Sequence, residues 1–212
     1  MRRGKQLSDA ILHAVERYYS GRFAEHGATA RGVDWNSQES QELRFEQLLR
    51  VADRQQGRFG LNDFGCGYGA LLAYLRAVGA EVDYRGFDLS ELMLKHAQVE
   101  YPHVRFVGSA AALERTDYTV ASGIFNVKLD TPFEQWREYV LATLDTIARL
   151  SVKGFAFNML TSYSDADRMR EDLYYGDPRF FFDHCKREYA RNVALLHDYG
   201  LYEFTTIVRL GE

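Results

Sequence analysis

Residues 63–69 form the sequence Asp63-Phe64-Gly65-Cys66-Gly67-Tyr68-Gly69, in which glycine occupies every second position from the third onward. The apolar segment 59–64 predicts a strand before this stretch, and residues 70–78 predict a helix after it. Glycine permits the tight turn that such a connection needs, and it lets a ligand touch the backbone. The free N–H groups of the helix N-terminus would face that ligand. The alternative is a glycine-rich turn that binds nothing.

An aspartate follows the next predicted strand along the chain. Asp88 comes directly after residues 82–87, and a carboxylate about 20 residues beyond such a loop can accept both hydroxyls of a ribose. The alternative is an exposed residue that caps the following helix, although Ser90 already offers that cap. Two nucleoside ligands fit both features: a dinucleotide, through the G-x-G-x-x-G/A pattern of residues 65–70, and S-adenosylmethionine, through a D-x-G-x-G-x-G loop.

Three features favour S-adenosylmethionine over a dinucleotide. Asp63 would repel a pyrophosphate, whereas it would attract a cationic amino acid head. Gly69 lies one position too early for the dinucleotide pattern. The chain ends in two predicted strands, 193–196 and 204–210, separated by a short turn. Such an antiparallel hairpin is foreign to the dinucleotide-binding fold.

Strands and helices alternate along the chain. Helices are predicted at residues 6–19, 36–54, 70–78, 91–100, 132–150 and 179–192, and strands at residues 59–64, 82–87, 104–107, 118–125, 154–160, 193–196 and 204–210. Asn36 and Thr131 are predicted to cap the second and fifth of these helices. Residues 21–35 are predicted as a glycine-rich loop. The alternation predicts an α/β fold: a Rossmann-like, seven-stranded, mostly parallel sheet with a C-terminal antiparallel hairpin and helices on both faces.

Length and composition limit the classes of protein. The chain of 212 residues is 46% hydrophobic and 26% charged, which fits one compact domain. Its net charge of -4 excludes a globally basic nucleic-acid-binding protein. Its two cysteines, Cys66 and Cys185, make neither a disulfide framework nor a zinc-type Cys-x-x-Cys pair, so no metal is expected. No apolar run reaches the roughly 20 residues that cross a bilayer, and the cytoplasm is the expected location.

Residues 62–129 resemble the core of a class I S-adenosylmethionine-dependent methyltransferase of the small-molecule type. The first, second and third family motifs are similar to residues 63–69, 87–90 and 106–111. Residues 118–125 resemble the fourth strand, whose end lies beside the reactive methyl group, and the terminal hairpin matches the antiparallel seventh strand. Two features depart from the family pattern. Ser109 stands where the third motif usually has an acid, and no Asn-Pro-Pro-Tyr sequence follows the fourth strand, so amide or base N-methylation of that type is not indicated.

The resemblance implies where each part of S-adenosylmethionine would lie. The glycine loop would hold the methionine end, Asp88 would accept the ribose hydroxyls, and Arg44 could pair with the cofactor carboxylate. The adenine ring would lie between Leu89 and Met93. The full set of implied cofactor-binding residues is Trp35, Arg44, Asp63, Gly65, Cys66, Gly67, Asp88, Leu89, Met93, Ser109, Ala110, Ser122 and Ile124. For Trp35 and Arg44 the alternative is ordinary packing and a solvated helix face.

The reaction itself needs few protein groups. In-line displacement at an activated methyl group depends on positioning, on desolvation and sometimes on a base. Candidates follow the carboxyl ends of the strands, where ligands bind in open α/β sheets. Asn126 and Tyr163 could orient a nucleophile, and His197 could act as the base. The alternative for each is a polar loop residue or a histidine with no part in the chemistry.

Aromatic residues are concentrated outside the cofactor half. Phenylalanine, tryptophan and tyrosine make up 14% of the chain, with ten of them from Tyr163 to Phe204 and four more in the first 36 residues. Both segments are predicted to cover the acceptor site, which predicts an acceptor with an apolar or aromatic portion. The predicted substrate-binding residues are Tyr18, Tyr19, Phe125, Tyr174 and His184. The alternative is that these aromatics, residues 180–182 in particular, pack against the sheet.

The chain is therefore predicted to be one methyltransferase domain. Its parts are an N-terminal helical cover (1–36), a cofactor-binding core (37–160), an aromatic lid (161–192) and the C-terminal hairpin (193–212). The predicted function is methyl transfer from S-adenosylmethionine to a small-molecule metabolite, in a monomer or homodimer with no nucleic-acid or membrane partner. The alternatives are a protein or RNA methyltransferase, an NAD(P)-dependent oxidoreductase on a Rossmann fold, and a binding module that has lost catalysis.

Overall fold

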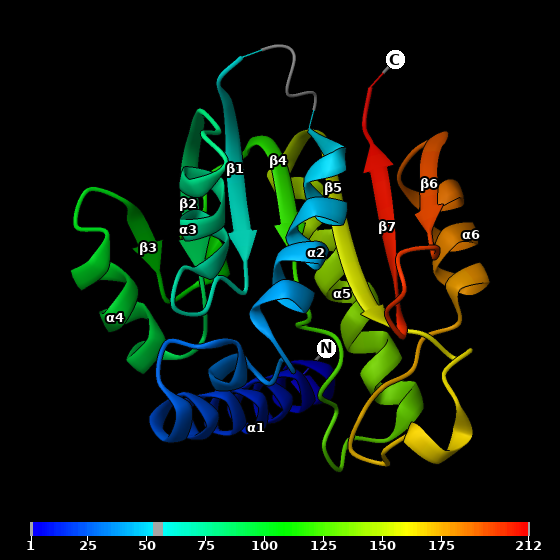
Figure 1. The fold of residues 1–212 in the computed structure, drawn as a ribbon. Coiled ribbons are helices and arrows are strands. Elements are labelled where there is room, and N and C mark those ends of the chain that lie inside the picture. The colour runs from blue at the N-terminus through cyan, green and yellow to red at the C-terminus, as the bar shows by residue number, and fades with distance from the viewer. Residues whose placement is uncertain (1, 53–56, 212) are drawn as a thin grey trace.

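The computed structural model describes residues 2–52 and 57–211, which contain a seven-stranded sheet with helices on both faces (Figure 1). The strands are β1 (Phe59–Phe64), β2 (Val82–Phe87), β3 (Arg105–Val107), β4 (Thr116–Ala121), β5 (Ser151–Leu160), β6 (Asn192–Leu196) and β7 (Glu203–Arg209). The helices are α1 (Arg2–His26), α2 (Gln38–Leu48), α3 (Ala70–Ala77), α4 (Glu91–Glu100), α5 (Phe133–Leu150) and α6 (Pro178–Glu188). This architecture confirms the predicted fold class.

The strand order places a switch point at the centre of the sheet. The order is β3-β2-β1-β4-β5-β7-β6; β1 to β5 pair in parallel, and β7 runs antiparallel between β5 and β6. The chain moves outward from β1 to β3 and then returns to pair β4 with the other edge of β1. Ligands of open α/β sheets bind outside the carboxyl ends of the strands at such a point. The segments that follow β1, β2 and β4 therefore converge on one edge.

Two hydrophobic clusters fill the space between the sheet and its helices. On one face the sheet packs against α5 and α6, with Trp136, Leu144 and Phe181 among the fully buried side chains. On the other face it packs against α2, α3 and α4, with Leu48 and Leu75 in the centre. Helix α5 is buried along one apolar stripe, as its spacing predicts, whereas the buried face of α2 also carries Gln41, Arg44 and Gln47.

Helix α1 crosses the carboxyl-end edge of the sheet rather than covering either face (Figure 1). It continues to His26, so the prediction of a loop from residue 21 is wrong. A glycine inside a helix costs only about 1 kcal/mol, and tertiary packing outweighs that cost here. Phe23 is buried, and its ring lies 6.1 Å from the ring of Tyr68 and 5.6 Å from that of His96.

Other element ends differ from the predictions by a few residues. Ser37, not Asn36, caps α2, and its side chain accepts a hydrogen bond from the Ser40 N–H. A 3-10 turn, Leu49–Val51, follows α2, and the last part of the predicted helix, residues 53–56, lies outside the described residues. Helix α5 has Pro132 at its N-cap in place of Thr131. Helix α6 ends at Glu188 because the chain must extend to pair β6 with β7 from residue 192 onward.

The segment from 161 to 177 connects β5 to α6 without regular strands. It contains a 3-10 turn, Ala166–Arg168, and single bridges join Val127 to Leu173 and Thr161 to Gly176. Tyr174 from this segment is fully buried against the α5 and α6 side of the core. Within the described residues, no helix has the length and apolar character needed to cross a membrane.

Candidate active site

The glycine loop after β1 adopts a backbone that only glycine tolerates well. Gly65, Gly67 and Gly69 have φ values of 92°, 54° and 90°, in the left-handed region. The Gly65 and Cys66 N–H groups donate to the Phe87 carbonyl at 2.7 and 2.8 Å, which ties the loop to the end of β2. The loop therefore wraps the carboxyl ends of two adjacent strands.

Asp88 holds this loop against the start of α4. Its Oδ2 accepts a hydrogen bond from the Gly67 N–H at 2.8 Å, and its Oδ1 accepts one from the Ser90 N–H at 2.9 Å. Burial raises the pKa of the Asp88 carboxyl, whereas these backbone N–H donors oppose the shift. Each carboxylate oxygen retains further lone pairs for a ligand hydroxyl.

Asp63, at the end of β1, is only 2% exposed. The Tyr84 hydroxyl donates to its Oδ2 at 2.6 Å. Burial is the main cause that raises the pKa of Asp63 to about 7. A buried carboxylate of this kind favours a cationic partner, because the partner restores the stability of its charged form.

One cavity of about 550 Å³ opens along this edge of the sheet. Every predicted cofactor-binding residue except Arg44 contributes to its wall: Trp35, Asp63, Gly65, Cys66, Gly67, Asp88, Leu89, Met93, Ser109, Ala110, Ser122 and Ile124. The predicted strand 118–125 ends at Ala121, so residues 122–124 form a loop, hereafter the β4 loop, whose Gly123 has a φ of 72°. The ends of β1, β2 and β4 thus meet around the cavity.

Helix α1 supplies a wall of which only Tyr19 was predicted. Leu12, Val15, Glu16 and Tyr19 line the cavity, and their spacing of three, one and three residues is that of one helical face. The Ser20 hydroxyl donates to Glu16 Oε1 at 2.7 Å and lies 2.7 Å from the Ser90 hydroxyl, which joins α1 to the start of α4. The amphipathic pattern of α1 was the available signal, but it does not say which ligand its face covers.

Helix α5 completes the wall, with Tyr139, Ala142, Thr143 and Thr146. Burial raises the pKa of Tyr139 to about 12 and raises that of Tyr19 further. Both hydroxyls therefore remain protonated at neutral pH and can donate hydrogen bonds to a ligand.

The residues present fit S-adenosylmethionine. The Ser122 hydroxyl lines the cavity and is buried, yet has no hydrogen-bond partner among the described residues. Such an orphaned group is costly unless a ligand or water pairs with it. Asp63 offers a site for an ammonium group, and Asp88 one for vicinal hydroxyls. The cavity volume lies within the roughly 300–1,000 Å³ of small-molecule sites.

Comparisons with known proteins identify the family. A family model described as "Methyltransferase domain" matches residues 62–149. A curated protein of Mycobacterium tuberculosis (strain H37Rv), "Putative methyltransferase Rv1506c", is 53% identical over 154 residues, which is 71% of this chain and 93% of that protein. This chain belongs to the class I S-adenosylmethionine-dependent methyltransferases. The membership decides between the two nucleoside ligands that the glycine loop left open, and S-adenosylmethionine is the cofactor of this methyltransferase.

Solved structures share the fold of this methyltransferase. Magnesium protoporphyrin IX methyltransferase (ChlM) from Synechocystis PCC 6803 with bound S-adenosylmethionine has a TM-score of 0.56 at 17% identity, over 82% of this chain and 81% of that chain. Mycolic acid cyclopropane synthase CmaA1 has a TM-score of 0.53 at 16% identity, over 74% of this chain and 64% of that chain. At these identities the likeness shows a common fold.

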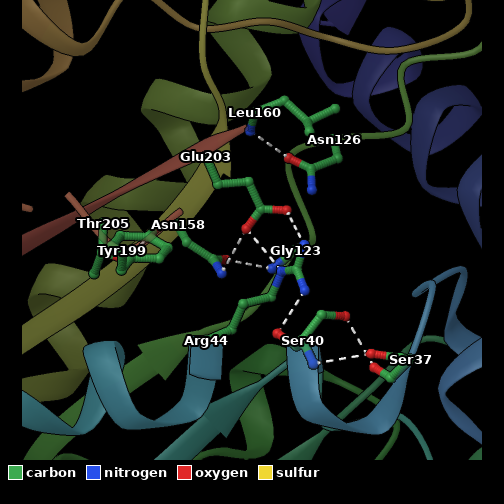
Figure 2. Close-up of polar contacts among 10 residues, drawn as sticks. All are labelled: Ser37, Ser40, Arg44, Gly123, Asn126, Asn158, Leu160, Tyr199, Glu203 and Thr205. Atoms are coloured by element: carbon green, nitrogen blue, oxygen red, sulfur yellow. Dashed lines mark hydrogen bonds and ion pairs between the residues drawn. The ribbon is translucent and has the colours of Figure 1, made fainter. Parts of the chain in front are cut away.

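The structure places the three predicted catalytic residues outside the cavity wall. Asn126 is buried, and its Oδ1 accepts a hydrogen bond from the Leu160 N–H at 3.0 Å (Figure 2). Tyr163 is 60% exposed, and its ring lies 5.9 Å from that of His197. This hydrogen bond connects the segment after β4 to the end of β5, so Asn126 has a structural role.

Only one of the predicted substrate-binding residues, Tyr19, contributes to the cavity wall. Tyr19 lines the cavity, whereas the Tyr18 hydroxyl donates to Asp34 at 2.7 Å and Phe125 is fully buried in the core. Tyr174 is fully buried too, and the His184 ring stacks at 6.3 Å on Phe180, away from the cavity wall. The expectation that residues 161–192 roof the acceptor site is therefore corrected: none of these residues lines the cavity in the described structure. Tyr174, Phe181 and Cys185 from this segment are buried in the core that includes α5 and β7 side chains instead.

Arg44 also departs from its prediction. Its guanidinium donates to the Glu203 carboxylate from Nε at 2.8 Å and from Nη2 at 2.7 Å, so its charge is balanced inside the protein (Figure 2). Its Nη1 donates to the Ser40 carbonyl at 2.6 Å. With these donors engaged, Arg44 does not reach the cavity wall as a partner for the cofactor carboxylate.

Proposed function

We propose that this methyltransferase methylates a small molecule with an apolar portion, held together with the cofactor under α1. The observation that carries this proposal is the enclosure of the cavity by α1 and α5 as well as by the sheet edge, with Leu12, Val15 and Tyr19 of α1 as apolar lining. A reacting group at the end of β4 is then accessible to a molecule that fits the cavity, and poorly accessible to a residue on a folded macromolecule. The names of ChlM and CmaA1 state magnesium protoporphyrin IX and mycolic acid, which are small molecules rather than proteins or RNA and so support this class of acceptor.

The cofactor-binding residues follow from the same geometry. Asp63 and the glycine loop would bind the methionine end, and Asp88 the ribose hydroxyls. Leu89 and Met93 would enclose the adenine ring, whose edge would face Ser109 and Ala110 in place of the acid that is usual at the former position. Residues 1–36 form the cover of the site, and residues 37–160 contain the cofactor-binding core.

The protein contributes position and exclusion of water to the reaction. When bound, the cofactor supplies a methyl group on a positively charged sulfur, and its displacement needs no covalent step on the protein. Ile124 and Trp35 present apolar surface at the β4 side of the cavity, and the Ser122 hydroxyl is free to orient a polar atom there. Alignment of the reacting atoms can lower the barrier of such a displacement by about 7–11 kcal/mol.

Cofactor binding is expected to strengthen as the pH rises to about 7 and then to level off. The pKa of Asp63 is raised by burial, so below pH 7 the free protein holds Asp63 neutral, whereas the cofactor ammonium favours the carboxylate. Binding must then release a proton, and affinity should rise by up to about tenfold per pH unit. Calorimetric titration with S-adenosylhomocysteine, which has the same ammonium group, measures this slope. Asp63→Asn should remove it, and a wild-type affinity that is constant from about pH 5 to pH 8 contradicts the assignment.

A labelled-methyl assay tests the class of acceptor. The protein is incubated with S-adenosylmethionine carrying a tritiated methyl group, together with a cell extract separated into small-molecule, protein and RNA fractions. The proposal predicts label in the small-molecule fraction, and none there with the Asp88→Ala variant. Label confined to protein or RNA contradicts the proposal and supports a macromolecular acceptor.

A further inference from the structure

We propose that Arg44, Glu203 and Asn158 form a positioning chain for the active site, which holds Trp35 and the β4 loop in place at the cavity wall. The proposal rests on the cofactor site proposed above. None of the three side chains lines the cavity, so each acts through another residue. Figure 2 shows the chain linking α2, β5 and β7 to the β4 loop.

The chain begins with a buried ion pair. The side chains of Arg44 and Glu203 are only 8% and 1% exposed. The pair is bidentate, and this geometry fixes the direction of both side chains. The third donor, Nη1, holds the guanidinium to its own helix through the Ser40 carbonyl. The guanidinium plane is thus restrained from α2 and from β7 at once.

Asn158 carries this restraint to the β4 loop. Its Nδ2 donates to Glu203 Oε2 at 3.2 Å, and its Oδ1 accepts a hydrogen bond from the Gly123 N–H at 2.7 Å. Asn158 is fully buried on β5, the strand next to β4. In this orientation the amide nitrogen donates to Glu203 while the amide oxygen accepts from the Gly123 N–H, so Asn158 connects the Gly123 peptide to the ion pair.

Trp35 provides a second route from Arg44 to the same loop. The guanidinium carbon lies 3.8 Å from the centre of the Trp35 ring. Trp35 in turn fits against Gly123 so closely that a Cβ there would lie 2.2 Å from Trp35 Cζ2. Trp35, Ser122 and Gly123 all line the cavity. Both routes therefore converge on the wall beside the expected position of the methyl group.

The energetics of buried ion pairs support a role in geometry. Desolvation of two charges offsets most of their attraction, and a well-packed apolar pair of similar size is often as stable. Removal of one partner alone is different, because it leaves a buried charge without compensation. Replacement of both charges by apolar side chains therefore separates the positioning role from the contribution to stability.

The test uses Arg44→Met combined with Glu203→Leu, with S-adenosylhomocysteine as the probe. We expect this variant to remain folded but to bind the probe at least about tenfold more weakly in calorimetry. Its tryptophan emission should also respond less to the probe, because Trp35 lines the cavity. A Trp35→Phe protein shows which part of the emission change arises from Trp35 rather than from Trp136. Arg44→Lys keeps the charge but not the flat, two-pronged donor, and should show a smaller loss in both readouts.

Thr206→Val on β7 is the matched control. Thr206 is fully buried, and its hydroxyl has no partner among the described residues, so probe affinity should stay within about twofold of wild type. The proposal is overturned if the double variant is folded and matches wild type in affinity and emission change. If the double variant does not fold, wild-type behaviour of Arg44→Lys overturns it. Absence of binding to the wild-type protein would contradict the cofactor site itself, and with it this proposal.

Discussion

Replacing Asp88 with alanine should weaken the binding of S-adenosylhomocysteine by about 100-fold or more. The substitution removes the acceptor for the Gly67 and Ser90 N–H groups, and it removes the carboxylate proposed to bind the ribose. Hydrogen bonds to a charged group contribute about 1.5–3 kcal/mol each, and two of them account for a factor of this size. Calorimetric titration of the folded variant measures the loss.

Asp83→Ala is the matched control for this prediction. Asp83 lies on the same strand, β2, but its side chain is 51% exposed and pairs with Arg85. Affinity for S-adenosylhomocysteine should be unchanged in this variant, because exposed ion pairs contribute little. Normal binding by the Asp88→Ala protein would show that the ribose lies elsewhere.

Replacing Gly65 with alanine should both destabilise the protein and abolish measurable cofactor binding. The φ of 92° at Gly65 is strained for alanine, and a Cβ there would lie 2.2 Å from Ile124 Cγ2. The β-branched Ile124 side chain has few χ1 rotamers available to relieve this clash, so we expect the glycine loop and the β4 loop to move apart. We expect a free energy of unfolding lower by about 1–3 kcal/mol than that of a variant with backbone strain alone.

Gly79→Ala is the variant with backbone strain alone. Gly79 follows the C-cap of α3 at a φ of 68°, and a Cβ there would meet nothing within 4 Å. Thermal unfolding and S-adenosylhomocysteine titration of the two variants separate the clash from the strain. Equal stability and equal binding in both would contradict the close packing of the two loops.

The cofactor side of the molecule could be predicted from the sequence because its requirements are local. A left-handed backbone demands glycine at residues 65, 67 and 69, and the carboxyl ends of adjacent parallel strands must meet, which brings Asp63 and Asp88 to one edge. These constraints act within a few residues of each motif. The residues expected around the cofactor could therefore be predicted without knowledge of contacts between distant parts of the chain.

The acceptor side could not be predicted in this way. The aromatic residues of 161–192 are equally suited to a core or to a binding site, and only tertiary packing directs Tyr174 and Phe181 inward. The same holds for Arg44, whose partner Glu203 is 159 residues away in the chain. For helix α1, the apolar face could be predicted from the sequence, whereas its position across the edge of the sheet could not.

A crystal structure with bound S-adenosylhomocysteine would locate the cofactor in the protein. We expect the ribose hydroxyls within hydrogen-bond distance of Asp88, the amino group beside Asp63, and the sulfur facing Ser122 and Ile124 beneath α1. A ligand bound outside this cavity, or one whose ribose does not contact Asp88, would contradict this expectation.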